Sequence, residues 1–578
     1  MQRAIAFVTY ETPYTPCGGI AAVMRFLPSH VRTASGREVV VLSPYHHNVY
    51  RGNPDDLTQV GAITVLFDSQ MVEVALLRQT ADPLFVFLKP KNGLFFAGNR
   101  HPYDLQPNQQ EQQPLLRDAL FFGNAACLAL SYLDPEASWT LLAQDWEGAA
   151  TAFGVASAGS GWPVYLTLHN SYDSGGLFDA MLLRAGIDPH TCPGQTGKKT
   201  ATVLERALLL VRPQVFTVSA QFARDLIDDP FQAEVMAPHL RETLRPRIIG
   251  IDNGLFTTQA VPSDIMARVE QGDSQPLLDW KKEKRDKVRA SLAAMQKNSG
   301  ESFWGNPGAF VDDNLPWFFM AGRDDARQKG YDVAAAAAES FLRQGGKARF
   351  IFCPMPGDEG LAGLGFLKKL TQRYPAHVLV IPAYWRDGYQ AALQGATFGI
   401  MPSLYEPFGM ASEYYQNGTP CIGRATGGLI QQIVPLRSAV ACSRAVEDCV
   451  RPWHAWSALS TGILFREKTE STRRLSDWTA INAAGYRNAP DGDRLSERMA
   501  YPLFQEMAGE LCKALFDAGQ LYHGDPGRYG SMVANGLQHI RAQFSWERCA
   551  GEYCRLMTGG SKESTKIFNS KHGGHNEG

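Results

Sequence analysis

Residues 396–420 read ATFGIMPSLYEPFGMASEYYQNGTP, and this stretch decides the expected fold. Its apolar run, ATFGIMPS, predicts a buried strand that leads directly to a carboxylate, Glu406, followed by Pro407. A second carboxylate, Glu413, comes two helical turns later. Ligands bind at the carboxyl ends of strands in open α/β sheets, so this stretch predicts a doubly wound fold with Glu406 at its functional edge.

The same alternation of short apolar runs and helical segments extends along the chain. The runs are AIAFVTY, VVVLSP, WTLLAQDW, VYLTLHN, QVFTVSA and RIIGIDNG in the first half, and WFFMAGR, ARFIFCPM, HVLVIPAYW, ATFGIMPS, TPCIGRA and TGILFRE in the second. This rhythm predicts an α/β protein with two mostly parallel, doubly wound sheets. With 578 residues, 44% of them hydrophobic, the chain is too long for one ordinary core, and two such domains facing each other create a deep cleft.

The segmentation expected from composition has five parts. They are an N-terminal domain over 1–255, a connection with a charged helix over 256–314, a second domain over 315–540, a C-terminal helix over 541–557 and a disordered tail over 558–578.

Charge and composition exclude several classes of protein. The chain has 56 basic and 58 acidic residues, a balance that argues against a nucleic-acid or membrane-surface binder. The basic run KKEKRDKVR at 281–289 has interleaved acids and predicts a solvated helix face. Ten scattered cysteines lack metal-ligand spacing. With no signal-like segment or apolar run long enough to span a membrane, we expect a cytoplasmic protein.

Two glycine pairs each follow a predicted strand and precede a helical segment. Gly18 and Gly19 lie in the first half, and Gly427 and Gly428 in the second. Backbone N–H groups at such a turn can bind an anion at a helix N-terminus, and two such sites suit a diphosphate. The alternative is that each pair is a structural turn.

Charged and polar residues also follow predicted strands. Arg323 and Lys329 flank the loop after WFFMAGR, where two fixed cations can stabilise a departing diphosphate without a metal; the alternative is solvated loop charges. His169 and Asp145 lie at the ends of two further predicted strands and are candidates for the site. The alternatives are that His169 is structural and that Asp145 caps a helix.

In order and spacing, these stretches resemble the glycogen and starch synthase family of retaining glycosyltransferases over nearly the whole chain. The matching segments are CGGIAAV, NRHPYD, LAQDWEGA, LTLHN, IDNGL, KRDKVRASL, GRDDARQKGYD, PSLYEPFGM, RATGGL, TGILF and FSWERCAGEYCRLM. The resemblance implies two Rossmann-like domains of the GT-B type, with the FSW helix crossing back onto the first domain.

The resemblance also implies a reaction and its residues. Glucose would pass from ADP-glucose or UDP-glucose to a carbohydrate acceptor, an α-glucan, with retention, and the leaving diphosphate would help to deprotonate the incoming hydroxyl. No cofactor or metal is expected. The implied catalytic set is Glu406, His169, Arg323, Lys329 and Asp145, with Gly18, Gly19, Gly427, Gly428, Asn253 and Thr426 at the donor and Glu413 as an uncertain second carboxylate.

Three departures from the family pattern keep alternatives open. Pro16 stands where a lysine is usual, Ala22 stands where an acid is usual, and the loop between Arg323 and Lys329 has one extra residue. The alternatives are a transferase of the same fold with another sugar or a small acceptor, and a glucan-binding scaffold with a disabled donor site.

Overall fold

The structure is a computed structural model that describes residues 3–109, 111–192, 200–297, 303–310, 314–357, 360–483 and 494–559. It contains two compact units. Unit 1 comprises Met1–Val218, Glu242–Gly254 and Ser545–Gly578, and unit 2 comprises Ser219–Arg241 and Leu255–Phe544. Residues 219–241 and the expected connection at 256–314 are therefore assigned to unit 2. From residue 560 onward, the expected tail lies outside the described residues.

Unit 1 contains a nine-stranded sheet in the order β11-β10-β7-β6-β1-β2-β5-β4-β3. The strands are β1 (Arg3–Val8), β2 (Val39–Pro44), β3 (Leu57–Phe67), β4 (Gln70–Gln79), β5 (Phe85–Pro90), β6 (Ser138–Gln144), β7 (Val164–Leu168), β10 (Val215–Thr217) and β11 (Ile248–Gly250). Strands β11 to β5 are parallel, while β3 and β4 add an antiparallel hairpin. The order changes direction between β1 and β6, which makes the carboxyl ends of these two strands the natural ligand-binding edge.

The β3–β4 hairpin is an element that we did not predict. Its turn residues, Asp68 and Ser69, have φ angles of 47° and 62°, typical of a tight hairpin turn. The signal was available in the sequence, because the apolar residues Ile63, Val65 and Phe67 occupy every second position at the end of β3, where they are buried.

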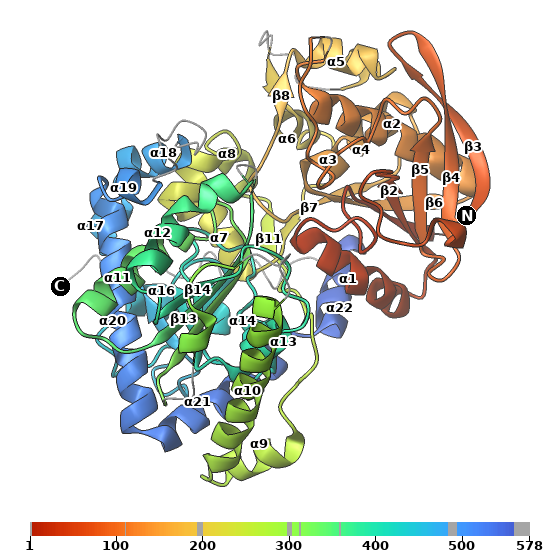
Figure 1. The fold of residues 1–578 in the computed structure, drawn as a ribbon. Helices are drawn as coiled ribbons and strands as arrows, with labels where there is room; N and C mark the ends of the chain where they lie inside the picture. Colours follow the sequence, from red (N-terminus) through yellow and green to blue (C-terminus); the bar gives the residue numbers. More distant parts are fainter. Residues whose placement is uncertain are drawn as a thin grey trace, which may run out of the picture. The chain divides into compact units, whose positions relative to one another are not determined.

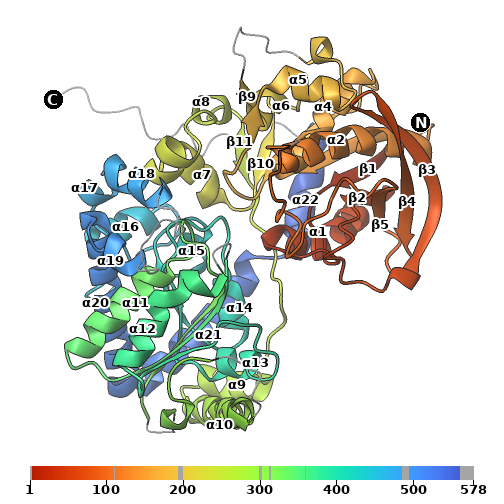
Figure 2. The ribbon, with the colours of Figure 1, turned by 45° about the horizontal axis from the view of Figure 1, so that its top comes forward.

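Helices cover the sheet of unit 1, and one of them comes from the far end of the chain. They are α1 (Gly19–Ser35), α2 (Pro114–Leu133), α3 (Asp145–Ala149), α4 (Thr151–Ser157), α5 (Phe178–Arg184), α6 (Val203–Ala207) and α22 (Trp546–Met557), with a small β8–β9 pair (Gly175–Gly176 and Ala201–Thr202). Helix α22 lies beside α1 (Figures 1 and 2), where the Trp546 and Phe26 rings stack 5.6 Å apart. The Tyr553 hydroxyl also lies 3.3 Å from the Thr167 hydroxyl in β7.

Unit 2 contains a six-stranded, fully parallel sheet in the order β14-β13-β12-β15-β16-β17. The strands are β12 (Trp317–Arg323), β13 (Arg349–Met355), β14 (Val378–Val380), β15 (Phe398–Met401), β16 (Cys421–Arg424) and β17 (Ile463–Phe465). Each coincides with one of the six predicted runs. In order along the chain the sheet reads 3-2-1-4-5-6, the Rossmann arrangement, so its switch point lies between β12 and β15.

The helices of unit 2 include the connection and a long C-terminal pair. They are α7 (Ala220–Asp228), the π-helix η3 (Phe231–Met236), α9 (Ser263–Glu270), α10 (Gln275–Lys297), α11 (Tyr331–Arg343), α12 (Gly365–Arg373), α13 (Tyr389–Gly395), α14 (Ala411–Gln416), α15 (Gly428–Gln432), α16 (Arg444–Val450), α17 (Thr469–Thr472), α18 (Leu475–Ala483), α19 (Arg494–Arg498), α20 (Pro502–Gly524) and α21 (Pro526–Gln543). Short helix α8 (Arg241–Leu244) spans the division between the units.

The basic run on α10 is not uniformly solvated, so that prediction is wrong for two of its charges. Lys281 and Arg285 are buried, and the Lys281 ammonium donates to the carbonyls of Gln394 and Ala396 at 3.0 and 2.7 Å. Burial, with the Arg285 charge as a smaller cause, lowers the pKa of Lys281 well below its usual value. These two cations tie α10 to the chain that enters β15.

Within the described ranges, none of the helices has the length and apolar character needed to cross a membrane.

Candidate active site

The loop that follows β12 carries both predicted cations. Arg323 is the last residue of β12, and Lys329 lies just before α11. The Asp325 carbonyl accepts the N–H groups of Gln328 and Lys329 at 3.0 and 2.8 Å, which folds the loop into a turn. The Arg323 guanidinium lies 3.4 Å from the Asp325 carboxylate. The loop therefore presents two cations at the switch point of the unit 2 sheet.

Glu406 meets this loop from the neighbouring strand end. Its side chain is 5% exposed, and Oε2 accepts the Lys329 ammonium at 2.8 Å and the Ser403 hydroxyl at 2.9 Å. The Leu404 N–H also donates to the Gln328 carbonyl at 2.7 Å. The structure thus brings Lys329 and Glu406 together, and backbone contact fixes the two loops against each other.

Glu413 lies in the first turn of α14, after the Glu406 loop. Burial raises the pKa of Glu413 to about 7, although the nearby Lys329 charge lowers it. Near neutral pH this carboxyl group is therefore partly protonated, unlike an ordinary solvated glutamate.

The second glycine pair packs against the Glu406 loop. The Gly427 N–H donates to the Asp225 carboxylate at 2.8 Å, and the Gly428 N–H donates to the Glu406 carbonyl at 3.0 Å. Thr426 is buried beside them. Both N–H groups thus have acceptors within unit 2, and the assignment of this turn to donor binding stays a prediction.

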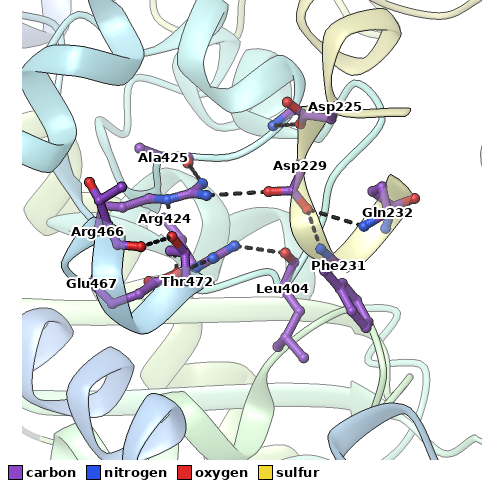
Figure 3. A network of polar contacts seen from close by, with 12 residues as sticks. Asp225, Asp229, Phe231, Gln232, Leu404, Arg424, Ala425, Arg466, Glu467 and Thr472 are labelled. Atoms are coloured by element: carbon purple, nitrogen blue, oxygen red, sulfur yellow. Dashed lines mark hydrogen bonds and ion pairs between the residues drawn. The ribbon is translucent and has the colours of Figure 1, made fainter. Parts of the chain in front are cut away.

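A buried network of charges contacts both the Glu406 loop and the turn at Gly427 and Gly428 (Figure 3). The Arg424 guanidinium forms a two-pronged ion pair with Glu467, both side chains being fully buried, and donates to the Leu404 carbonyl at 2.7 Å. Arg466 donates to the Ala425 carbonyl. The Glu406 loop and the glycine turn are therefore both fixed to charges at the ends of β16 and β17.

The network extends to α7 through a pair of carboxylates. Arg466 lies 3.3 Å from Asp229, and Asp229 in turn accepts the Phe231 N–H at 3.1 Å (Figure 3). Burial and the nearby Asp229 charge raise the pKa of Asp225 to about 7. The carboxyl group on the Gly427 N–H is thus partly protonated at neutral pH.

In unit 1, His169 and Asp145 meet at the ends of β7 and β6. Asp145 has a φ of 54°, unusual for a residue with a side chain, and its carboxylate accepts the His169 N–H at 2.5 Å and the Asn170 amide at 2.8 Å. Burial raises the pKa of Asp145 to about 7 and lowers that of His169 to about 3. The imidazole is therefore neutral.

The tautomer of His169 follows from its neighbour. The Gln144 amide nitrogen donates to the Leu142 carbonyl at 3.0 Å, so its oxygen faces His169 Nε2 at 2.8 Å. Nε2 must then carry the proton and donate, which leaves Nδ1 as a hydrogen-bond acceptor.

At the first glycine pair, a carboxylate of the protein itself binds the backbone N–H groups. Glu11 Oε2 accepts the N–H groups of Cys17 and Gly18 at 3.0 and 2.6 Å, and Glu11 Oε1 accepts the Tyr103 hydroxyl at 2.8 Å. Gly19 begins α1, and Asn253 is buried, with its N–H donating to the Val218 carbonyl at 3.2 Å. As at Gly427, the anion seen at Gly18 belongs to the protein itself.

Sequence reasoning missed several of these partners. Glu11, Gln144, Arg424 and Glu467 each lie at or just after the end of a predicted strand, and that position was an available signal. Asp225 has no such signal, because it lies inside α7 and 202 positions from Gly427.

Comparison with known proteins finds relatives of the chain. The family described as "Family 4 Glycosyltransferase in conflict systems" matches residues 289–453. The chain is 25% identical over 432 residues to the glycogen synthase of Kosmotoga olearia, covering 74% of this chain and 82% of that protein. It is 26% identical over 494 residues to that of Dechloromonas aromatica, covering 84% and 94%.

Among solved structures, the catalytic domain of starch synthase IV from Arabidopsis thaliana, bound to ADP and acarbose, matches with a TM-score of 0.65 at 17% identity, covering 96% of this chain and 99% of that one. The expected resemblance to the glycogen and starch synthase family is confirmed, and the fold is of the GT-B type. The comparisons support a glycosyltransferase of the glycogen synthase type.

Proposed function

We propose that the chain transfers glucose from ADP-glucose or UDP-glucose to an α-glucan acceptor with retention at the anomeric carbon. The observation that carries this proposal is the 2.8 Å pair between Lys329 and Glu406 at the switch point of the unit 2 sheet, with Arg323 on the same loop. A carboxylate for the sugar and cations for the diphosphate thus come from adjacent strand ends, where α/β folds bind ligands.

The cations act on the leaving group. Negative charge grows on the diphosphate oxygen as its bond to the sugar breaks, and Arg323 and Lys329 offer fixed positive charge for it. In the structure each cation contacts a carboxylate, Asp325 or Glu406. Donor binding would replace these contacts, and the released Glu406 would face the positive charge that develops on the transferred sugar.

In unit 1, His169 serves as a neutral hydrogen-bond acceptor for a sugar hydroxyl through Nδ1. Its low pKa keeps it uncharged over the working pH range, Gln144 fixes the orientation of the imidazole, and Asp145 holds the backbone N–H of His169. The diphosphate oxygen itself deprotonates the incoming hydroxyl on the same face, so His169 is not needed as a general base.

The experiment that tests this proposal measures nucleoside diphosphate release from a panel of sugar nucleotides with glycogen as acceptor. We expect release with ADP-glucose or UDP-glucose, and release that persists in excess EDTA because the cations supply the charge. The Glu406→Gln variant should stay folded and lose about a hundredfold or more in kcat. The matched control is Glu470→Gln, which changes an exposed glutamate. Wild-type turnover in a folded Glu406→Gln protein would contradict the proposal.

Two alternatives are outcomes of the same panel. Turnover only with another sugar nucleotide or a small acceptor would identify a different transferase of this fold. A glucan-binding scaffold is favoured by one observation, the Glu11 carboxylate on the Cys17 and Gly18 N–H groups, where a donor phosphate was expected. A scaffold would bind glucan and release no nucleoside diphosphate.

A further inference from the structure

The cation loop is flanked by two aspartates that pair with a distant helix. Asp324 directly follows Arg323, and Asp332 lies in the first turn of α11, just after Lys329. Both carboxylates are buried and pair with arginines of α19. The two ends of the loop are thus tied to a segment 170 positions further along the chain.

The contacts have a specific geometry. Arg494 donates to both oxygens of Asp324, at 2.7 and 3.2 Å, and its Nε lies 3.5 Å from Asp332. Arg498 Nε lies 3.2 Å from the same Asp332 oxygen. The Arg494 guanidinium also lies 4.3 Å from the centre of the Phe366 ring in α12. One arginine therefore bridges both ends of the loop and is itself held against α12.

Energetics favour a positioning role for these pairs. A buried ion pair adds little net stability, because desolvation offsets most of the attraction, but a two-pronged arginine–carboxylate pair fixes both partners in orientation. Asp324 is also the immediate neighbour of Arg323, and without Arg494 its charge would compete for that cation. Pairing with α19 thus holds the loop and neutralises carboxylates that lie next to the predicted diphosphate cations.

We propose that Arg494 and Arg498 of α19 are positioning residues that set the geometry of the loop from Arg323 to Lys329. The proposal rests on the proposed function for the role of that loop, and it explains how a loop with one residue more than the family pattern keeps a defined shape.

The test separates loop geometry from stability. Arg494→Met leaves Asp324 buried without its partner, so we expect lower thermal stability, faster amide exchange at residues 324–330 and about tenfold or greater loss of affinity for ADP or UDP, whichever binds. Arg494→Met combined with Asp324→Asn removes both charges. Stability should then recover, whereas exchange and nucleotide affinity should stay altered.

Recovery of all three measurements in the double variant would overturn the proposal, as would unchanged exchange in Arg494→Met. If Arg494→Met does not fold, Arg494→Lys keeps the charge but not the two-pronged contact, and should still show faster loop exchange. Arg474→Gln, which changes an exposed arginine, is the control with no expected effect. Amide exchange can be measured without a substrate, so the two proposals can fail separately. A wild-type protein that is inactive on every sugar nucleotide would refute the proposed function alone. Wild-type exchange rates in the variants of an active enzyme would refute the positioning role alone.

Discussion

The two glycine pairs look alike in sequence and differ in what surrounds them. Each follows a strand, and each has an N–H bound by a carboxylate of its own unit, Glu11 at Gly18 and Asp225 at Gly427. A Cβ atom on Gly19 would meet nothing within 4 Å, whereas one on Gly427 would lie 1.6 Å from the Glu406 carbonyl oxygen. The first pair leaves room around the start of a helix, and the second lets two loops of the candidate site touch.

The glycine pair at Gly427 and Gly428 is therefore explained by packing rather than by anion binding. The φ of Gly427 is 49°, and a Cβ on Gly428 would lie 2.3 Å from the Phe408 carbonyl oxygen. Glycine is therefore required there for close packing against the chain around Glu406, whether or not an anion binds. At Gly18 and Gly19 no such packing demand exists, so anion binding is the better reason for glycine.

The largest effect should come from Gly427→Ala. The added methyl group has no space beside the Glu406 carbonyl, and the φ is unfavourable, so we expect about 3 kcal/mol or more of lost stability and loss of turnover. Denaturant unfolding measures the first and nucleoside diphosphate release the second. A variant within about 1 kcal/mol of wild type would show that the second turn is as open as the first.

The next largest effect should come from removing a cation from the loop between Arg323 and Lys329. Glu406, which packs against the second glycine turn, contacts this loop through Lys329. Lys329→Ala or Arg323→Ala should lower turnover about a hundredfold or more, because each removes a fixed charge from the leaving diphosphate. Arg327→Ala changes an exposed arginine of the same loop and is the matched control. Turnover within about threefold of wild type in both cation variants would remove these residues from the site.

The strands and their charged ends were predictable because both signals are local. All six strands of unit 2 and six of the nine in the unit 1 sheet coincide with predicted apolar runs, Arg323 and His169 lie at the ends of such runs, and Glu406 comes three residues after one. To recognise a charged strand end in the sequence, one needs only the apolar run and the few residues around its end.

The remaining contacts were not predictable because they depend on tertiary packing. Asp225 reaches Gly427 across 202 positions, and Arg494 reaches Asp324 across 170. Lys281 looked solvated because its carbonyl acceptors belong to another part of the chain, the end of α13 and the residue that follows it. Charge patterning along one helix does not show which face the rest of the fold will cover.

The carboxylate at the second turn predicts a pH dependence of stability. The pKa of Asp225 is raised to about 7, so the folded chain holds this proton more tightly than the unfolded chain, and the resulting stability is present below about pH 4 and lost as the pH rises through about 7. Asp225→Asn stays neutral and should reduce the slope of unfolding free energy across this window by up to about 1.4 kcal/mol per pH unit.

Urea unfolding at several pH values measures that slope. Asp387→Asn, an exposed aspartate, is the control and should keep the wild-type slope. An Asp225→Asn slope equal to that of wild type would show that the carboxyl group at the second turn does not take up a proton on folding.

The smallest effect should come from Gly19→Ala at the first turn. The methyl group has open space, and alanine favours the first turn of α1 over glycine, so we expect a gain of up to about 1 kcal/mol in unfolding free energy. Thermal unfolding beside Gly427→Ala gives the direct contrast. A loss of more than about 1 kcal/mol would mean that the first turn is packed as tightly as the second.

The return of α22 to unit 1 has a consequence for how the chain is made. The sheet of unit 1 is built from Met1–Val218 and Glu242–Gly254, but the helix beside α1 is α22, Trp546–Met557, from the far end of the chain. A ribosome releases the N-terminal part of a chain first, so unit 1 must wait, with the Phe26 side of α1 uncovered, until nearly all of unit 2 has been synthesised. Nascent chains therefore expose this surface to aggregation and chaperone capture, and exchange of unit 1 between homologues by recombination needs a crossover near residue 544 as well as those near residues 218, 241 and 254.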